Sequence, residues 1–257
     1  MSETLPSTVH SPLMAASPAR PVQRRLRGGP VRRTLRALST VLMVTGALLL
    51  ADAGLTLVWQ EPFSALYAHF RQGALRTDLG RLNAQPPTST DASALTHLRV
   101  QRQRIAFLAR SLERHAAEGS AVGRIDIPHI RANFVLIKGT GESDLKSGPG
   151  VYPQTRFPGV PGTTAIAGHR TTYLAPFRHV DALRRGDRIL VTMPYADFTY
   201  TVTGERIVAP TDVGVIDPVG YDRVVLSACN PLYSAAQRII VFGRLTHVSA
   251  RGAALRV

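Results

Sequence analysis

The sequence has 257 residues, a formal net charge of +14 and a single cysteine, Cys229. One cysteine excludes an internal disulfide, so a thiol in an exported chain must pair with a partner, stay buried and inert, or react. All basic residues except Lys138 and Lys146 are arginines, and after residue 60 they are scattered along the chain. We therefore expect no nucleic-acid partner, and acidic lipids or wall polymers as the counter-charges.

Residues 1–36 are polar and rich in proline and serine. They cannot bury enough apolar surface to fold alone, which predicts a disordered, basic cytoplasmic tail. Glu3 is the one acidic residue among its many arginines: Arg20, Arg24, Arg25, Arg27, Arg32, Arg33 and Arg36.

Residues 37–59 predict a transmembrane anchor, because "LSTVLMVTGALLLADAGLTLVW" has about the 20 residues that a helix needs to cross a bilayer. Asp52 lies near the distal end, where it could reach the interface, and Trp59 suits the headgroup boundary. The arginines precede the apolar run, which predicts a single-pass protein of the cell membrane with a cytoplasmic N-terminus and an extracellular remainder.

Two other interpretations of this segment remain. The small residues "ADA" at 51–53 resemble a signal cleavage site, and "RRTLRAL" at 32–38 loosely resembles a twin-arginine signal. A retained anchor and a cleaved signal both imply export, whereas a buried helix of a soluble protein does not.

Residues 60–120 predict an extracellular juxtamembrane linker and helix. Helical potential extends over 60–85, and "QPPTSTDAS" at 85–93 indicates a linker or a helix start capped by Asp91 or Ser93. A single amphipathic helix should follow, because leucine and isoleucine recur at helical spacing, at Leu95, Leu98, Ile105, Leu108 and Leu112.

The pattern changes between residues 121 and 250, where short runs rich in Val, Ile, Thr and Tyr are separated by Gly, Pro, Asp and Asn. Closely spaced short strands without intervening helices predict one compact all-β barrel or sandwich. Residues 251–257 are predicted to form a C-terminal tail.

Three polar residues lie at predicted strand ends. Cys229 ends "RVVLSAC", Arg238 begins "RIIVFGRL" after a short loop, and His169 ends "TAIAGH". A thiol can act as the nucleophile of acyl transfer, an imidazole can exchange protons with the leaving and incoming amines, and a guanidinium can stabilise an oxyanion. Each residue taken singly could equally be structural.

The segments "VGRIDIPHI", "DLKSGPGVYP", "PGTTAIAGHRTTYLAPF", "DALRRGDRI", "PTDVGVIDP" and "LSACNPLYSAAQRIIVFGRL" resemble, in order, the sortase family of cysteine transpeptidases, class E type. The resemblance implies a closed eight-stranded β-barrel. It assigns Cys229 as nucleophile, His169 as catalytic histidine and Arg238 as catalytic arginine.

The same resemblance implies the reaction and its partners. The enzyme would cut an LAxTG- or LPxTG-like sorting signal between Thr and Gly, form a thioacyl intermediate, and transfer the acyl group to an amine. That amine would belong to a peptidoglycan precursor or another protein, so that surface proteins become anchored to the cell wall. No cofactor is implied.

The sequence departs from the family where it reads "VLSAC". Val225 and Ala228 replace threonines, and because Ala228 directly precedes the nucleophile, we expect Ser227 and Ala228 to lie near bound substrate. Tyr173, in "GHRTTY", either lines the peptide groove or packs structurally. No metal site is expected, because Glu142 and Asp144 are too few to bind calcium.

Two further functions were weighed. A catalytically idle barrel could bind or assemble surface proteins. An L,D-transpeptidase would place its arginine about two residues from the cysteine, whereas here a loop separates them, so that activity is disfavoured.

Overall fold

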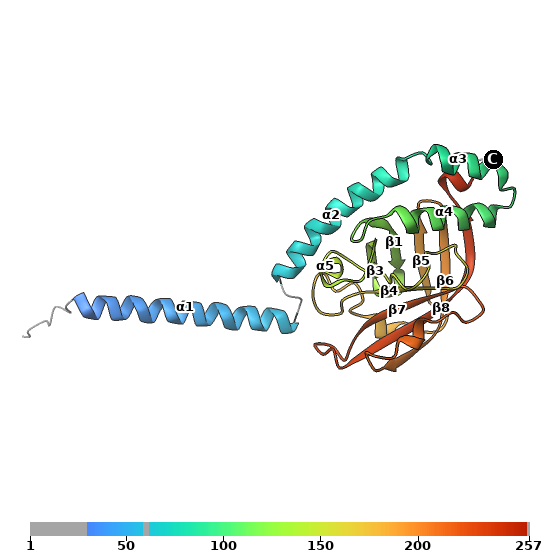
Figure 1. The fold of residues 1–257 in the computed structure, drawn as a ribbon. Coiled ribbons are helices and arrows are strands. Elements are labelled where there is room, and N and C mark those ends of the chain that lie inside the picture. The colour runs from blue at the N-terminus through green and yellow to red at the C-terminus, as the bar shows by residue number, and fades with distance from the viewer. Residues whose placement is uncertain (1–29, 59–61, 256–257) are drawn as a thin grey trace, which may run out of the picture. The chain divides into compact units, whose positions relative to one another are not determined.

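A computed structural model describes residues 30–58 and 62–255 (Figure 1). The chain divides into two compact units, residues 1–49 and 50–257. The predicted tail up to residue 29, and Trp59, lie outside the described residues.

Helix α1 runs from Pro30 to Val58. Its stretch Pro30–Gly54, 25 residues, is long and apolar enough to cross a membrane. The prediction of disorder for 30–36 is wrong, because these residues are helical. Proline is accepted in the first turn of a helix, arginine is a good helix former, and extending an existing helix costs little.

Three helices follow: α2 (Pro62–Ala84), α3 (Ser89–His97) and α4 (Gln101–His115). The cap of α3 is Thr88, whose side chain accepts a hydrogen bond from the Asp91 N–H, so neither Asp91 nor Ser93 is the cap. The predicted single amphipathic helix is divided between α3 and α4. Leu98 is extended there, and apolar residues seven apart, such as Leu98 and Ile105, fit two successive helices as well as one.

Eight strands form a closed barrel in the order β1-β2-β3-β4-β7-β8-β6-β5, which confirms the predicted fold (Figure 1). Two neighbouring pairs are parallel, β2 with β3 and β4 with β7, and the others are antiparallel. The strands are β1 (Ala121–Ile127), β2 (Ala132–Lys138), β3 (Gly150–Val151), β4 (Thr163–Ala167), β5 (Arg188–Met193), β6 (Ala196–Val208), β7 (Arg223–Asn230) and β8 (Gln237–Ala250).

Short helical turns join some strands: α5 (Glu142–Leu145) and 3₁₀ turns at Pro128–Ile130, Val180–Ala182, Val213–Ile216 and Gly252–Ala254. The last turn is part of the barrel, because Ala254 is buried in its core. That core is built from alternate side chains of the strands, and Ile105 and Ala109 of α4 pack into it.

Helix α2 is fixed to the barrel through the buried side chain of Gln72. Its amide oxygen accepts from the Val135 N–H at 2.8 Å, and its amide nitrogen donates to the carbonyls of Val135 at 3.2 Å and Ser147 at 2.8 Å. Strand β3 is registered with β2 only at Ile137 and Lys138. Gln72 therefore supplies hydrogen-bond partners to the backbone of β2 at Val135, where β3 does not extend.

Gln72→Leu should lower the free energy of unfolding by about 1–3 kcal/mol, because buried backbone groups at Val135 and Ser147 lose their partner. Thermal unfolding of the detergent-solubilised full chain measures the effect. Thr77→Leu, at an exposed position of the same helix, is the control and should leave the melting temperature nearly unchanged. Equal melting temperatures for both variants would show that α2 is not held by this amide.

Candidate active site

Three neighbouring strands, β4, β7 and β8, bring the predicted site residues to one edge of the sheet. Cys229 of β7 is the register partner of Arg238 of β8. On the other side of β7, Ala167 of the parallel strand β4 is the partner of Ser227. His169 and Cys229 each lie two residues beyond that pair, and the Gly168 N–H continues the pairing by donating to the Ser227 carbonyl at 3.1 Å.

Side chains of β7 alternate between two faces of the barrel wall. Val224, Leu226 and Ala228 belong to the barrel core. Val225 packs instead in a separate apolar cluster with Ala165, Val208 and Ile240. Because side chains alternate along a strand, Ser227 and Cys229 share the face of Val225. His169 and Arg238 continue the same face of β4 and β8.

The Ala228 side chain does not lie on the face of Cys229. Ala228 is 3% exposed and packs in the barrel core, on the wall face opposite Cys229. Adjacency to the nucleophile in sequence suggested contact with substrate, but successive residues of a strand point to opposite faces. Ser227 does lie on the site face, where its hydroxyl accepts from the Tyr152 hydroxyl at 3.4 Å.

A cavity of about 290 Å³ adjoins the thiol and is lined by Arg170, Thr171, Thr172, Cys229, Pro231, Tyr233, Ser234 and Ala235. Cys229 is partly exposed. Arg238 donates from Nη1 to the carbonyls of Ala235 and Gln237, both at 2.9 Å. These two bonds turn one guanidinium nitrogen toward the β7–β8 loop and leave Nε and Nη2 without a hydrogen bond to the described residues.

His169 is half-buried, and its Nε2 has no hydrogen-bond partner among the residues that the structure describes. Burial lowers the pKa of His169, and the positive charge of Lys146 lowers this pKa further. The neutral imidazole is therefore favoured, with one ring nitrogen free to exchange a proton with a bound group. A buried, unpaired polar atom is uncommon and is typical of a functional site.

The loop after His169 is fixed by a backbone hydrogen bond and by close packing. The Phe177 N–H donates to the His169 carbonyl at 3.0 Å. A Cβ on Gly168 would lie 2.6 Å from the Phe177 ring, so only glycine fits directly before the histidine without a shift. Tyr173, Leu174 and Ala175 all have positive φ angles, which non-glycine residues adopt only when their surroundings impose it.

Tyr173 connects this loop to helix α2. Its ring lies 5.2 Å from the His169 ring, between centroids, and 6.3 Å from the Tyr67 ring. Its backbone N–H donates to the Ser64 hydroxyl at 3.3 Å. Tyr173 therefore packs between the histidine and the juxtamembrane helix, and its role in lining a peptide groove stays a prediction.

We expect a histidine titration followed by NMR to give a midpoint for His169 below the ordinary pKa of 6.5. Lys146→Met should raise that midpoint, since a nearby positive charge disfavours protonation. Because the folded pKa is lowered, protonation opposes folding: the effect on stability is absent above about pH 6.5 and grows as pH falls through the folded pKa.

The His169→Gln spectrum assigns the signal, and Arg81→Met, which removes an exposed charge elsewhere, is the control. A midpoint at or above 6.5, or no response to the loss of Lys146, would contradict this account of the histidine.

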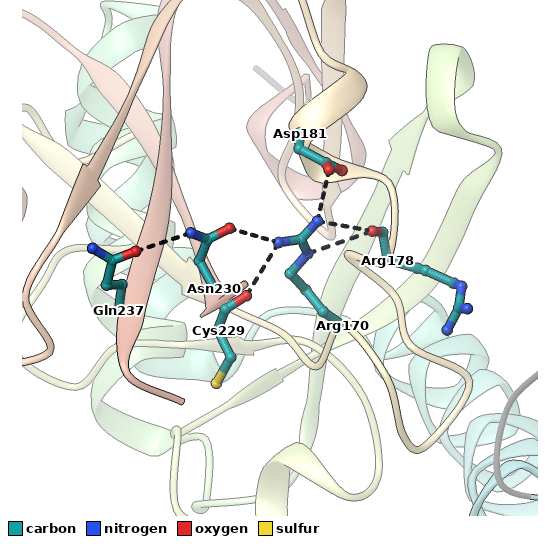
Figure 2. A network of polar contacts seen from close by, with 6 residues as sticks. All are labelled: Arg170, Arg178, Asp181, Cys229, Asn230 and Gln237. Atoms are coloured by element: carbon teal, nitrogen blue, oxygen red, sulfur yellow. Dashed lines mark hydrogen bonds and ion pairs between the residues drawn. The ribbon is translucent and has the colours of Figure 1, made fainter. Parts of the chain in front are cut away.

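Sequence reasoning missed a second arginine at the site, Arg170 (Figure 2). It is 3% exposed, and its Nη2 forms an ion pair with Asp181 at 2.8 Å. Nη1 donates to the Asn230 side-chain oxygen at 3.0 Å and the Cys229 carbonyl at 3.4 Å, and Nε and Nη2 donate to the Arg178 carbonyl at 3.4 Å.

Arg170 therefore ties the end of β7 to the loop that follows the histidine. Figure 2 shows the guanidinium between the two segments, with the Cys229 sulfur pointing away from it. The signal in the sequence was its place directly after His169, but its partners Cys229 and Asn230 are 59 and 60 residues away along the chain.

Within residues 30–58 and 62–255, no group of three His, Cys, Asp or Glu side chains is arranged to hold a metal. The acidic residues considered for calcium have protein partners. Glu142 pairs with Lys146 at 2.8 Å, and Asp144 accepts from the Gly141 N–H at 3.1 Å.

Comparisons with known proteins agree with this architecture. Residues 125–246 match the family model described as a sortase domain. Sortase D of Bacillus subtilis is 31% identical over 130 residues, which cover 49% of this chain and 64% of that protein. Sortase SrtE1 of Streptomyces coelicolor is 32% identical over 99 residues, which cover 35% of this chain and 28% of that protein.

The structure of the SrtF sortase from Corynebacterium diphtheriae superposes with a TM-score of 0.51 and 25% identity, covering 54% of this chain and 90% of that one. The chain spans less than two thirds of the two relatives named above. The closed barrel and the match over residues 125–246 define the class that this chain resembles, the sortase domain.

Proposed function

We propose that this chain is a membrane-anchored cysteine transpeptidase of the class E type that attaches surface proteins to the cell wall. One observation carries the proposal: Cys229 and Arg238 are register partners near the ends of β7 and β8, and His169 lies two residues beyond the end of the adjacent strand β4, on the same face by alternation. This arrangement supplies a nucleophile, a proton carrier and an oxyanion donor to one bound carbonyl.

In the proposed reaction, neutral His169 takes the proton of the Cys229 thiol, and the resulting thiolate attacks the threonine carbonyl of an LAxTG- or LPxTG-like signal. Arg238 donates hydrogen bonds to the oxyanion of the tetrahedral intermediate, and protonated His169 gives its proton to the leaving glycine amine. The C–N bond breaks and a thioester remains. An acceptor amine then attacks the thioester, loses a proton to His169, and releases the thiolate as the new amide forms.

The face beside the thiol is backed by apolar side chains. Val225 and Ile240 are buried on this face, and Ile216 packs against them. Ser227 and Tyr152 place a hydroxyl pair there. The partly exposed thiol adjoins the cavity of about 290 Å³, which gives a peptide access to Cys229.

The anchor and its orientation are part of the proposal. Helix α1 has the length and composition of a membrane span, and the sequence before it is rich in arginine. A positive flank on that side favours a cytoplasmic N-terminus and places the barrel outside the cell.

The test is ligation by the full-length protein in detergent or liposomes. The purified chain is incubated with a labelled LAxTG peptide and an amine, and mass spectrometry follows both the ligated product and a thioester on Cys229. Product together with the adduct supports the proposal. Peptide binding without either would identify the idle barrel instead.

Arg170→Lys should lower kcat by about 10²-fold while changing KM little, because misplacing a reacting group by about 1 Å costs this much in rate. Lysine keeps a charge for Asp181 but cannot reach both sides of the site as a planar fork does. Steady-state ligation kinetics measure kcat and KM separately, and a melting curve checks the fold.

Arg184→Lys is the matched control, because Arg184 is an exposed arginine of the same β4–β5 connection, and its hydrogen bonds to Asp187 involve only its backbone. This variant should keep near-parental kcat. If Arg170→Lys instead raises KM at constant kcat, then Arg170 binds substrate and does not position the site.

A further inference from the structure

The first turns of α2 carry an exposed apolar stripe, formed by Phe63, Leu66 and Phe70. These side chains are 79%, 55% and 69% exposed. Their spacing of three and four residues places them on one face of the helix. Farther along the helix, this face reaches the polar residue Thr77, so the stripe covers only the part of α2 that lies nearest to α1 in sequence.

The opposite face of α2 is committed to the barrel. Ser64, Ala68, Gln72 and Leu75 are buried, each no more than 8% exposed. At 3.6 residues per turn, these residues lie roughly opposite the stripe. Packing on the barrel therefore does not account for the aromatic residues on the other face, and large exposed apolar groups at helical spacing are typical of a binding surface.

Chain continuity indicates what covers the stripe. Helix α1 ends at Val58, and α2 begins at Pro62, so Phe63 follows the membrane span by only a few residues. Residues 62–77 include Arg76 and Arg71, whose Nε donates to the Ser147 hydroxyl at 3.2 Å. The acidic residues Glu61 and Asp78 lie just outside this stretch. Apolar side chains flanked by positive charge are the features of a helix that lies in a membrane interface.

We propose that the α2 apolar stripe inserts into the headgroup region of the membrane that α1 crosses, so that α2 seats the barrel on the lipid surface. The proposal rests on the proposed anchor. Ser64 and Tyr67 of α2 contact Tyr173 beside His169. The seat would therefore hold the active-site loop within about one helix diameter, 10–12 Å, of the membrane.

The single cysteine makes the test direct, because Cys229→Ala leaves a full-length chain without thiols. Phe63→Cys, Leu66→Cys or Phe70→Cys is added singly, spin-labelled, and reconstituted in liposomes containing anionic lipid. Collision of each label with oxygen, which concentrates in lipid, is compared with collision with a water-soluble nickel complex. Asp78→Cys on the same helix is the water control, and Val44→Cys in α1 is the lipid control.

At all three stripe positions we expect the oxygen-to-nickel ratio to exceed that at Asp78 several-fold, approaching the ratio at Val44. If the ratio at the stripe positions equals that at Asp78 while the ratio at Val44 is that of lipid, the insertion of the stripe is overturned but the membrane anchor is not. Labels shielded from both reagents would show that protein, such as a second copy, covers the stripe, which also overturns it. A water-accessible Val44 would overturn anchor and seat together. Because the background lacks the thiol, none of these outcomes depends on catalysis.

Discussion

Cys229→Ala is expected to bring ligation and thioester formation below detection while leaving the fold unchanged. The chain contains no other cysteine, so no second thiol can replace the nucleophile. Cys229 is partly exposed on the outer face of β7, outside the barrel core, and its removal opens no cavity in that core. Intact-mass measurement after peptide incubation should show the acyl adduct on the parent and none on the variant.

Cys229→Ser serves as the companion variant, because it retains size and polarity but loses the thiolate. It should be nearly as inactive, with the melting temperature of both variants close to that of the parent. Ligated product from Cys229→Ala at a rate near the parental one would mean that another group performs the attack, and the proposed mechanism would be wrong.

Arg238→Lys should lose about 10²- to 10³-fold in ligation rate, which is the usual cost of removing one preorganised oxyanion donor. Lysine retains the charge but not the planar fork that could bond the loop carbonyls and a substrate oxygen together. The fold should persist, because the residues that follow in β8, Ile239, Ile240 and Val241, are buried and apolar and support the strand without the guanidinium. Ligation kinetics beside a melting curve separate the two effects.

Arg206→Lys is the matched control, since Arg206 is an exposed arginine on the adjacent strand β6 whose register partner is Ile240. It should keep near-parental activity. Near-parental activity of Arg238→Lys, or inactivity caused only by unfolding, would remove Arg238 from the proposed site.

Helix α2 links the two parts of this protein's proposed function. One face satisfies the edge of β2 through Gln72 and supports the His169 loop through Ser64 and Tyr67. The other face begins with the apolar stripe, which follows α1, the helix proposed to span the membrane, in sequence. Helix α2, in the segment 60–85 for which the sequence predicted only helical potential, therefore belongs to the catalytic unit and, in our proposal, to its membrane attachment.

Much of the fold was predictable because its signals are local. Seven of the strands coincide with short β-branched runs that turn residues interrupt. The apolar run after the arginines predicted a long helix. Strand β3 was missed, because Gly150 and Val151 are too few residues to show an alternating pattern.

The candidate triad was predictable for a different reason. Cys229, His169 and Arg238 stood at the ends of predicted strands within motifs that resemble a known family. The predicted barrel therefore placed the three residues close together. Their roles stay predictions until the variants are measured, whereas the register of Cys229 with Arg238 is now a structural fact.

The sequence by itself determined the strand-rich barrel, the apolar N-terminal helix and the three candidate residues, because hydrophobic period and turn chemistry act over a few neighbouring positions. Tertiary structure alone decided that Ala228 faces the core, that Arg170 bridges two distant segments, and that α2 supports the active-site loop. Those outcomes depend on strand register and on contacts between segments tens of residues or more apart, and no local pattern of residues encodes which distant partner a side chain will meet.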